Sequence, residues 1–294
     1  MRVRHGAAHR AGTVAIYIFL SLTAFITLYP FVYVFSMSIS GPDAILKNQV
    51  WLWPVGFSLG SFKLIFANKG IFVSYFNTIW YAVVGTALGT TVTICAAYAL
   101  SRREFFMRNA VMLYITVTML FSGGLIPLFI IVSRMGLYNT RWAIVLPAVV
   151  VTYNMIVART YFASSIPDSL PESAKMDGCT DIGILWRIVL PISKPIISVM
   201  VLFYAISRWN SYFPETIYLT KSELQPLQVY LRKILILNSQ LDIISGLEED
   251  LSRLAYVLQI KYAMIVVAIL PIICLYPFLQ KYFVQGVMLG SIKG

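Results

Sequence analysis

The chain has 294 residues, of which 59% are hydrophobic and 12% are charged, with a net charge of +11 and a mean hydropathy of +0.78. An average soluble domain has about 25% charged residues, so this composition excludes a soluble globule, and it equally excludes a disordered, collagen-like or disulfide-framework protein. A basic balance often indicates nucleic-acid binding, but in so apolar a chain it indicates loops that face anionic lipid and the cytoplasm.

Six segments are long and apolar enough to cross a bilayer as helices, since a span needs about 20 apolar residues. They cover residues 13–39, 72–100, 109–133, 142–163, 195–219 and 261–281. The predicted fold is therefore an all-α membrane protein with six transmembrane helices. A basic tail over 1–12 precedes a single transmembrane domain over 13–294.

The orientation follows from the first segment and the basic residues. Arg2, Arg4 and Arg10 precede the first segment, as they would in a signal peptide. Its apolar run is longer than that of a signal peptide and no small-residue cleavage site follows, so we interpret it as a retained anchor. Six spans place both termini on one side. Lys and Arg are only slightly more numerous there, but the bias is clear in the shortest segments and places both termini in the cytoplasm.

Glycine and proline mark points in the spans where helices pack closely or bend. Gly85 and Gly89 form a GxxxG pair in the second segment, a spacing that favours close helix packing. The glycines at 123–124, Pro127 and Pro271 can open kinks beside a cavity. Packing explains each of them more readily than contact with a substrate.

Polar residues near the middle of two spans are candidates for a substrate pathway, because polar groups are costly there. The fourth and fifth segments carry these candidates, which are Tyr153, Asn154, Arg208, Trp209 and Asn210. Trp209 offers a ring on which a sugar can stack, and Asn210 offers a donor and an acceptor for hydroxyl groups. Arg208 has two interpretations. It attracts an anionic sugar, or it pairs with Glu215 on roughly the same helix face.

No catalytic motif is recognisable in the sequence. It contains no phosphate-binding loop, nucleophile elbow or zinc-protease motif. The cysteines and histidines do not have the spacing of a metal site or a disulfide framework; they are Cys95, Cys179, Cys274, His5 and His9. The chain is therefore predicted to perform no covalent chemistry and to hold no metal or cofactor of its own. Energy for uphill transport would come from ion coupling or from a separate subunit.

A polar stretch over 164–194 separates the fourth and fifth segments and is long for a simple connection. Ser169 and Glu172 have capping-box spacing, which predicts a short helix that ends before Gly178. Thr180 is placed to cap a second short helix. The residues alone leave open whether this helical hairpin binds a partner or is a plain surface feature.

The same stretch resembles the signature loop of the permease subunits of ABC importers. That signature is Glu-Ala-Ala, three residues, Gly, nine residues and Ile-x-Leu-Pro. The matching residues here are Glu172, Ser173, Ala174, Gly178, Ile188, Leu190 and Pro191, with Ser173 as the one departure. The resemblance implies that the loop forms coupling helices in a cleft of an ATPase subunit. Glu172 would face a basic group there, Gly178 would form the turn, and Asp177 beside it would belong to the same contact.

Other motifs resemble the carbohydrate importers of the maltose type. They are Trp53-Pro54, Phe76-Asn77-Thr78, AAYALSR at 96–102, GLYNT at 136–140, and Trp209-Asn210 with Phe213. The ending, QKYFVQG at 280–286 and GSIKG at 290–294, is similar to the second, shorter permease of such pairs. The stretch over 276–283 resembles a branch associated with complex and acidic oligosaccharides, including alginate.

The resemblance implies a type I ABC importer permease of the bacterial inner membrane that moves an oligosaccharide. Its partners would be a second homologous permease, two ATPase subunits that bind ATP and Mg, and an extracytoplasmic binding protein. The loop over 220–260 has apolar residues at helical spacing and would form part of the contact with that binding protein. Two alternatives stay open. One is an ABC permease for another solute class, and the other is an ion-coupled secondary transporter, which should carry ionisable groups deep in several spans.

Overall fold

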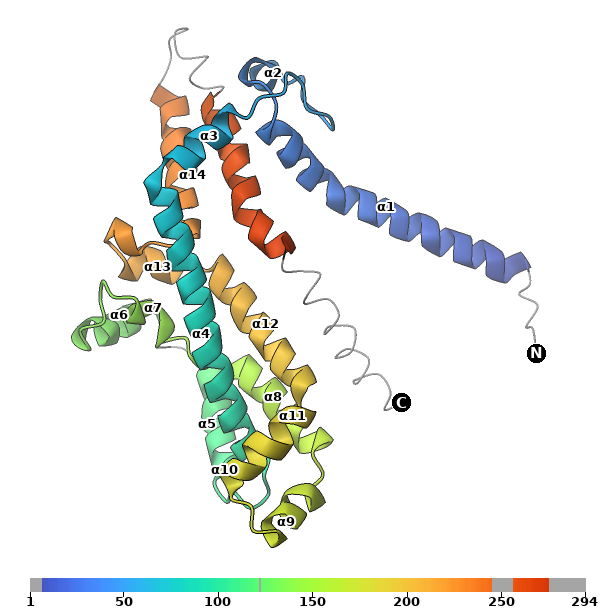
Figure 1. The fold of residues 1–294 in the computed structure, drawn as a ribbon, viewed down its shortest axis with the longest axis vertical. Coiled ribbons are helices and arrows are strands. Elements are labelled where there is room, and N and C mark those ends of the chain that lie inside the picture. The colour runs from blue at the N-terminus through green and yellow to red at the C-terminus, as the bar shows by residue number, and fades with distance from the viewer. Residues whose placement is uncertain (1–6, 122, 245–255, 275–294) are drawn as a thin grey trace. The chain divides into compact units, whose positions relative to one another are not determined.

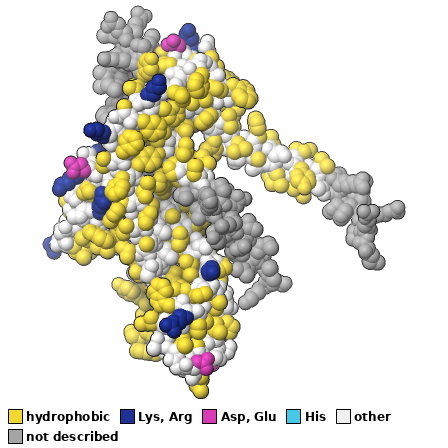
Figure 2. All heavy atoms as spheres, in the orientation of Figure 1, with side chains coloured by type: hydrophobic (Ala, Val, Ile, Leu, Met, Phe, Trp, Pro, Cys, Tyr) yellow, Lys and Arg dark blue, Asp and Glu magenta, His cyan; other side chains and the backbone are white. Residues whose placement is uncertain are grey.

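The structure is a computed structural model that describes residues 7–121, 123–244 and 256–274. Every regular element in these residues is helical, which confirms the all-α prediction for this part of the chain. The chain forms two compact units, 1–69 with 231–271 and 70–230 with 272–294 (Figure 1). Hydrophobic side chains cover most of the surface visible in Figure 2, and charged side chains are few, as expected of a protein surrounded by lipid.

The first unit has a small core beside a long exposed helix. It contains α1 (Ala7–Ser38), α2 (Pro42–Leu46), α3 (Gly60–Ala67), the later part of α14 (Leu227–Ile244) and a helix over Tyr256–Cys274. Met37, Ala44, Ile45 and Val50 form the core, against which Tyr33 and Tyr262 pack. The side chains of residues 12–32 in α1 are all exposed although the helix is apolar all round, which is the pattern of a membrane span.

The second unit is organised around α4 (Lys69–Ser101), whose 33 residues correspond to a length of about 50 Å. The C-terminal half of α4 packs with α5 (Arg108–Leu120), α8 (Thr152–Ser165) and α12 (Lys194–Asn210). Its middle packs with α6 (Leu125–Arg134), α7 (Trp142–Val145) and α13 (Phe213–Tyr218). The two groups have separate hydrophobic cores, and α4 takes part in both.

The stretch over 164–194 is helical and lies at the C-terminal end of α4 (Figure 1). It contains α9 (Ser169–Met176), α10 (Asp181–Ile184), a π-helical turn η1 (Leu185–Val189) and α11 (Leu190–Ile192). The helix over Asp181–Ile192 meets α12 at 85°. We call residues 164–194 the coupling loop from here on, after the signature that it carries.

The described residues contain three helices that are long and apolar enough to cross a membrane. They are Gly12–Ser38, Lys69–Ser101 and Tyr256–Cys274, and two bent helix pairs would bring the number to five. The three helices correspond to the predicted segments 13–39, 72–100 and 261–281, the last as far as residue 274. The predicted total of six is not confirmed, because the other three predicted segments are interrupted.

Each interruption has a local cause in the sequence. The segment 109–133 divides into α5 and α6 next to Gly124. The φ of Gly124 is +81°, a conformation that glycine adopts readily. The kink expected at this position is therefore confirmed. The prediction of one continuous helix over 142–163 is wrong, because α7 ends at Val145 and α8 begins only at Thr152. Pro147 lies between them and cannot continue a helix.

The predicted segment 195–219 is also divided, into α12 and α13, with Pro214 in the first turn of α13. Helix α14 confirms the helical spacing predicted in the loop over 220–260. The motifs at 276–283, 280–286 and 290–294 lie outside the described residues.

Candidate functional site

The first helix of the coupling loop, α9, begins at Ser169, one residue earlier than a capping box with Ser169 as its N-cap requires. Asp168, rather than Ser169, occupies the N-cap position, and no side chain caps the helix. The predicted capping box is therefore wrong. The Asp168 carboxylate is engaged by two arginines instead, and the Ser173 hydroxyl donates to the Ser169 carbonyl at 2.9 Å. Glu172 is left exposed, and it makes no ion pair within the described part of the chain.

The turn after α9 confirms the role predicted for Gly178. Its φ is +82°, a conformation that side chains with a Cβ rarely adopt. The Gly178 N–H donates to the Lys175 carbonyl at 3.0 Å, and the Cys179 N–H donates to the Ala174 carbonyl at 2.9 Å. These two bonds form a Schellman motif, which satisfies the last carbonyl groups of α9 and reverses the chain direction within a few residues.

Thr180 caps the second helix as the sequence predicts. Its Oγ1 accepts a hydrogen bond from the Gly183 N–H at 3.2 Å. The helix then continues through the π-helical turn η1, so that Ile184, Leu185 and Val189 are all buried. Of the signature residues near the end of this helix, Ile188 and Leu190 are partly buried and Pro191 is exposed.

The coupling loop shares one hydrophobic core with three helices of the second unit. We call this the coupling core, and its buried members are Ile94, Ala97, Tyr98, Leu100, Met155, Ala158, Phe162, Ile166, Ala174, Ile184, Leu185, Val189, Ile196 and Met200. They come from α4, α8, the loop itself and α12. The coupling loop therefore packs directly against α8 and α12.

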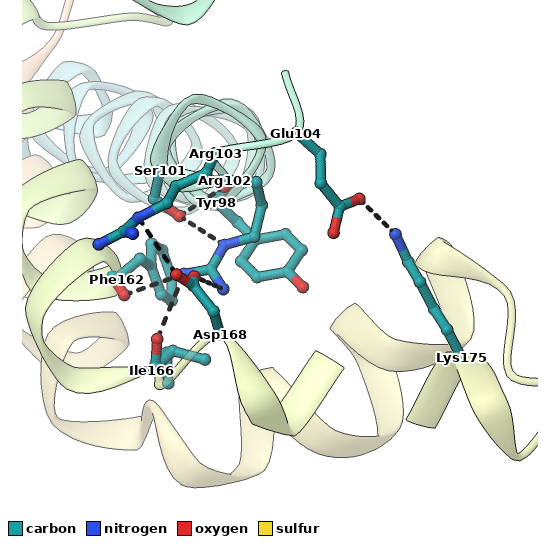
Figure 3. Close-up of polar contacts among 9 residues, drawn as sticks. All are labelled: Tyr98, Ser101, Arg102, Arg103, Glu104, Phe162, Ile166, Asp168 and Lys175. Atoms are coloured by element: carbon teal, nitrogen blue, oxygen red, sulfur yellow. Dashed lines mark hydrogen bonds and ion pairs between the residues drawn. The ribbon is translucent and has the colours of Figure 1, made fainter. Parts of the chain in front are cut away.

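Charged groups fasten the start of the loop to the end of α4 (Figure 3). Arg102 Nη2 donates to the carbonyls of Phe162 at 3.2 Å and Ile166 at 3.5 Å, and its guanidinium lies over the Tyr98 ring at 5.2 Å. Its Nη1 lies 3.5 Å from Asp168 Oδ1. One largely buried cation therefore binds both the end of α8 and the residue before α9.

Lys175 makes the second ionic contact between the coupling loop and the residues that follow α4. Its Nζ binds Glu104 in the loop that follows α4 and lies 3.2 Å from Asp181 at the start of α10 (Figure 3 shows the Glu104 contact). The hydrogen bond to Glu104, followed by that to Asp181, raises the pKa of Lys175 above its ordinary value. The contact between Lys175 and Glu104 could not be read from the sequence, because the two residues lie 71 positions apart in it.

The outer surface of the loop is apolar and acidic. Met176 at the end of α9 is 88% exposed, Ile182 in α10 is 72% exposed, and Trp186 in η1 is 59% exposed. Glu172 is exposed as well. Large exposed apolar side chains on a polar loop are typical of a surface that contacts another protein or a membrane.

The residues predicted to line a substrate pathway do not share one surface. Tyr153 and Asn210 are exposed, whereas Asn154, Arg208 and Trp209 are buried. The Tyr153 ring lies 6.5 Å from that of Phe203 on α12. Side chains of Asn154 and Trp209 point into packed surroundings, which leaves Tyr153 and Asn210 as the accessible members of the set.

Arg208 does not form the predicted ion pair with Glu215 within the described residues. Its guanidinium donates to two backbone carbonyls at the end of α7 and to that of Ala148, between α7 and α8. Glu215 does not pair with it and instead accepts a hydrogen bond from Ser211 Oγ at 2.9 Å. The carbonyl contacts favour a structural role for Arg208. The described residues also contain no group of three His, Cys, Asp or Glu side chains that could hold a metal ion.

Membrane-length apolar helices joined to a packed helical loop define an integral membrane protein. Residues 89–289 match the family described as "Binding-protein-dependent transport system inner membrane component". The chain belongs to this family of inner-membrane transport components.

Two relatives and one solved structure show how far the similarity extends. The chain is 40% identical to the polygalacturonan/rhamnogalacturonan transport system permease protein YtcP of Bacillus subtilis, over 95% of this chain and 97% of the relative. It is 28% identical to the arabinooligosaccharides transport system permease protein AraQ of Halalkalibacterium halodurans, over 92% and 93%.

The solved structure is a chain of a bacterial ABC transporter involved in the import of the acidic polysaccharide alginate. Its TM-score is 0.86 at 34% identity, and the match covers 96% of this chain and 99% of that chain. The resemblance to permeases of carbohydrate ABC importers is therefore confirmed, and so is the type I importer fold. The family consists of inner-membrane components of binding-protein-dependent transport systems.

Proposed function

We propose that this chain is a permease subunit of an ATP-driven ABC importer that brings an oligosaccharide into the cytoplasm. The observation that carries the proposal is the coupling core, which joins the loop to α8 and α12. Closure of ATPase subunits against the loop would shift these helices and change the side from which the pathway is open. ATP and Mg would be bound by the ATPase subunits, and this chain would perform no covalent chemistry.

The partners follow from the same proposal. A second, homologous permease would complete the pathway, and two ATPase subunits would bind the coupling loops. An extracytoplasmic binding protein would deliver the sugar, with the loop over 220–260 as part of its contact. Both termini would lie in the cytoplasm. Among the signature residues, Glu172 and Asp177 offer exposed carboxylates for a basic group of the ATPase, beside the apolar side chains of α9 and α10.

The substrate class that has most support is an acidic oligosaccharide. Two of the similar proteins carry substrates of this kind by name, polygalacturonan/rhamnogalacturonan and alginate. Arg208 does not add to this support, because its donors are used by backbone carbonyls. Tyr153 and Asn210 are exposed and remain candidates for stacking on a sugar ring and for binding its hydroxyl groups.

Glu172→Gln tests the coupling role. We expect the variant to insert and assemble normally but to lose uptake and the stimulation of ATP hydrolysis by the binding protein, by about tenfold or more. Asp43→Asn is a matched control, since it removes an exposed carboxylate from α2, outside the coupling loop. Normal uptake by the Glu172 variant would contradict the coupling role of this residue.

Purification in detergent separates the proposal from its alternatives. An ABC importer should copurify with an ATPase and a second permease, whereas an ion-coupled transporter should act alone and ignore ATP. Binding measurements with neutral and uronic-acid oligosaccharides, made on the binding protein, would then distinguish an acidic substrate from a neutral one or from another solute class.

A further inference from the structure

The interruption between α7 and α8 places irregular backbone within a predicted membrane segment. Residues 146–151 lie between the two helices and include Pro147, which has no N–H to donate. Backbone groups without regular helical partners must be satisfied by neighbouring groups when no bulk water is present. Two buried side chains of α12, Tyr204 and Arg208, meet this need.

Arg208 binds the end of α7 and the first half of the interruption. Its Nη1 donates to the Ile144 carbonyl at 2.8 Å, and its Nη2 donates to the carbonyls of Val145 at 3.3 Å and Ala148 at 2.6 Å. The first two carbonyls belong to α7, whose end leaves them without partners in the helix. One guanidinium therefore holds the end of α7 against α12 by charge-assisted hydrogen bonds.

Tyr204 binds the second half. Its hydroxyl accepts a hydrogen bond from the Val151 N–H at 3.2 Å and lies 2.6 Å from Thr93 Oγ1 on α4. Tyr204 precedes Arg208 by one helical turn, so the two side chains leave α12 on the same face. Together they bind the interruption at both ends.

The glycine pair of α4 makes room for these two side chains. A Cβ at Gly85 would lie 2.9 Å from Arg208 Nε, and a Cβ at Gly89 would lie 2.8 Å from the Tyr204 ring. Both distances are shorter than real Cβ contacts. The close packing predicted from the GxxxG spacing is therefore an approach of α12 side chains to the α4 backbone, at two successive turns.

The interruption also separates two hydrophobic cores. The coupling core includes Met155 of α8 and Met200 of α12, whereas residues 143–145 of α7 pack in the other core with Tyr81 and Tyr218. The chain crosses from one core to the other at 146–151, and α12 ends at the same boundary. Arg208 and Tyr204 therefore connect a helix of the coupling core to the start of the neighbouring core.

We propose that Tyr204 and Arg208 are positioning residues for the transport step, with Gly85 and Gly89 as the sites that seat them. They hold the interruption at 146–151 in one shape, so that movement of the coupling core is passed to α7 and the core around it. Without these two side chains the backbone at 146–151 would change shape instead, and the movement of the coupling core would not reach α7. The proposal rests on the proposed function, and it makes the position of the guanidinium, rather than its charge alone, the decisive property of Arg208.

Gly85→Ala tests this because it leaves Arg208 in the chain but displaces its guanidinium. In the complete transporter in lipid vesicles, we expect Gly85→Ala and Arg208→Ala each to lower the maximal uptake rate by about tenfold. The sugar concentration for half-maximal uptake should stay within about twofold, for acidic and neutral sugars alike. Gly85→Ala should add almost no further loss in an Arg208→Ala chain, because the steric conflict is then absent. Gly12→Ala is the control, since a Cβ there meets nothing within 4 Å.

A second readout does not depend on the substrate. Tyr204→Phe keeps the ring against Gly89 but removes the acceptor of the Val151 N–H, so amide exchange across 146–151 should accelerate by about tenfold or more. Arg208→Lys should restore part of the uptake that Arg208→Ala loses.

Three outcomes would each overturn the proposal. They are wild-type uptake by Gly85→Ala, additive losses in the double variant, and unchanged amide exchange in Tyr204→Phe. A loss confined to acidic sugars would show substrate attraction instead. If the wild-type complex itself moves no sugar, the proposed substrate fails, while the exchange measurement still tests the positioning role.

Discussion

Arg102 Nη1 lies 3.5 Å from Asp168 Oδ1, and this contact joins the residue after α4 to the residue before α9. The neighbouring Arg103 also reaches Asp168, with Nε 3.2 Å from Oδ2, but the two arginines differ in their surroundings. The Arg102 side chain is 13% exposed and also binds two backbone carbonyls, whereas the Arg103 side chain is 82% exposed. Arg102 therefore makes a largely buried contact with Asp168, whereas Arg103 makes a surface ion pair with the same carboxylate.

Arg102→Ala should loosen the coupling loop and lower coupled ATP hydrolysis and uptake. The carbonyls of Phe162 and Ile166 lose their charged donor, which should cost about 2 kcal/mol of stability in the loop. Arg103→Ala should change the stability by less than about 1 kcal/mol, as expected for an exposed pair. Limited proteolysis of the loop in the purified transporter measures both. Equal sensitivity of the two variants would show that the carbonyl contacts of Arg102 contribute nothing.

Gly178→Ala should destabilise the turn between α9 and α10 by about 1 kcal/mol, because φ at this residue is +82°. Gly178→Asn should cost less, since asparagine tolerates this conformation better. Amide exchange at Gly178 and Cys179, whose N–H groups close the turn, would measure the difference. Slower exchange in the alanine variant than in the asparagine variant would contradict the conformational argument.

Lys175 should react slowly with amine reagents at mildly alkaline pH. Its pKa is raised by Glu104 and Asp181, so folding favours the protonated form, which does not react. The contribution of this lysine to stability is complete below the ordinary lysine pKa and is lost as the pH rises through the higher folded value. Glu104→Gln should lower the pKa and speed up labelling of Lys175, as read by peptide mass spectrometry. An unchanged labelling rate would show that Glu104 does not hold the ammonium group.

Asn77→Ala should release the connection between α13 and α14. Asn77 is fully buried, donates to the carbonyls of Glu223 at 2.7 Å and Gln225 at 3.3 Å, and accepts from Arg141 at 3.0 Å. Loss of this amide should cost about 2 kcal/mol, and the melting temperature of the purified complex should fall. Thr216→Ala is the control, because the exposed Thr216 hydroxyl donates to the Tyr212 carbonyl one helical turn earlier. A melting temperature equal to that of the control would contradict this role.

The features that sequence reasoning predicted well are those set by near neighbours in the chain. The turn at Gly178 and the cap at Thr180 depend on φ and on a hydroxyl three residues from its partner, and both were found as predicted. The long spans at 13–39 and 72–100 follow from uninterrupted apolar runs. The loop signature, read residue by residue, led to the family.

Features that depend on distant contacts were missed or misread. Asp168 displaced Ser169 from the N-cap because Arg102 engages its carboxylate, and Arg102 lies in a different loop. The interruption at 146–151 has a local signal in Pro147, but hydropathy did not show it, since its residues are as apolar as those of a membrane helix. The GLYNT motif served only as a resemblance, yet Asn139 has a φ of +59° and its side chain binds the N–H groups of Thr220 and Lys221.

Gly85 and Arg208 are far apart in the sequence, but the Arg208 side chain occupies the space that a Cβ at Gly85 would need. Gly89 and Tyr204 have the same relationship one helical turn away. A chain that replaces either glycine with a larger residue must shorten the opposing side chain or shift a helix. Among related permeases these positions should therefore change in pairs, and the pairing should appear as covariation between two segments that share no local motif. The contact between α4 and α12 can then be recognised in a relative from its sequence alone.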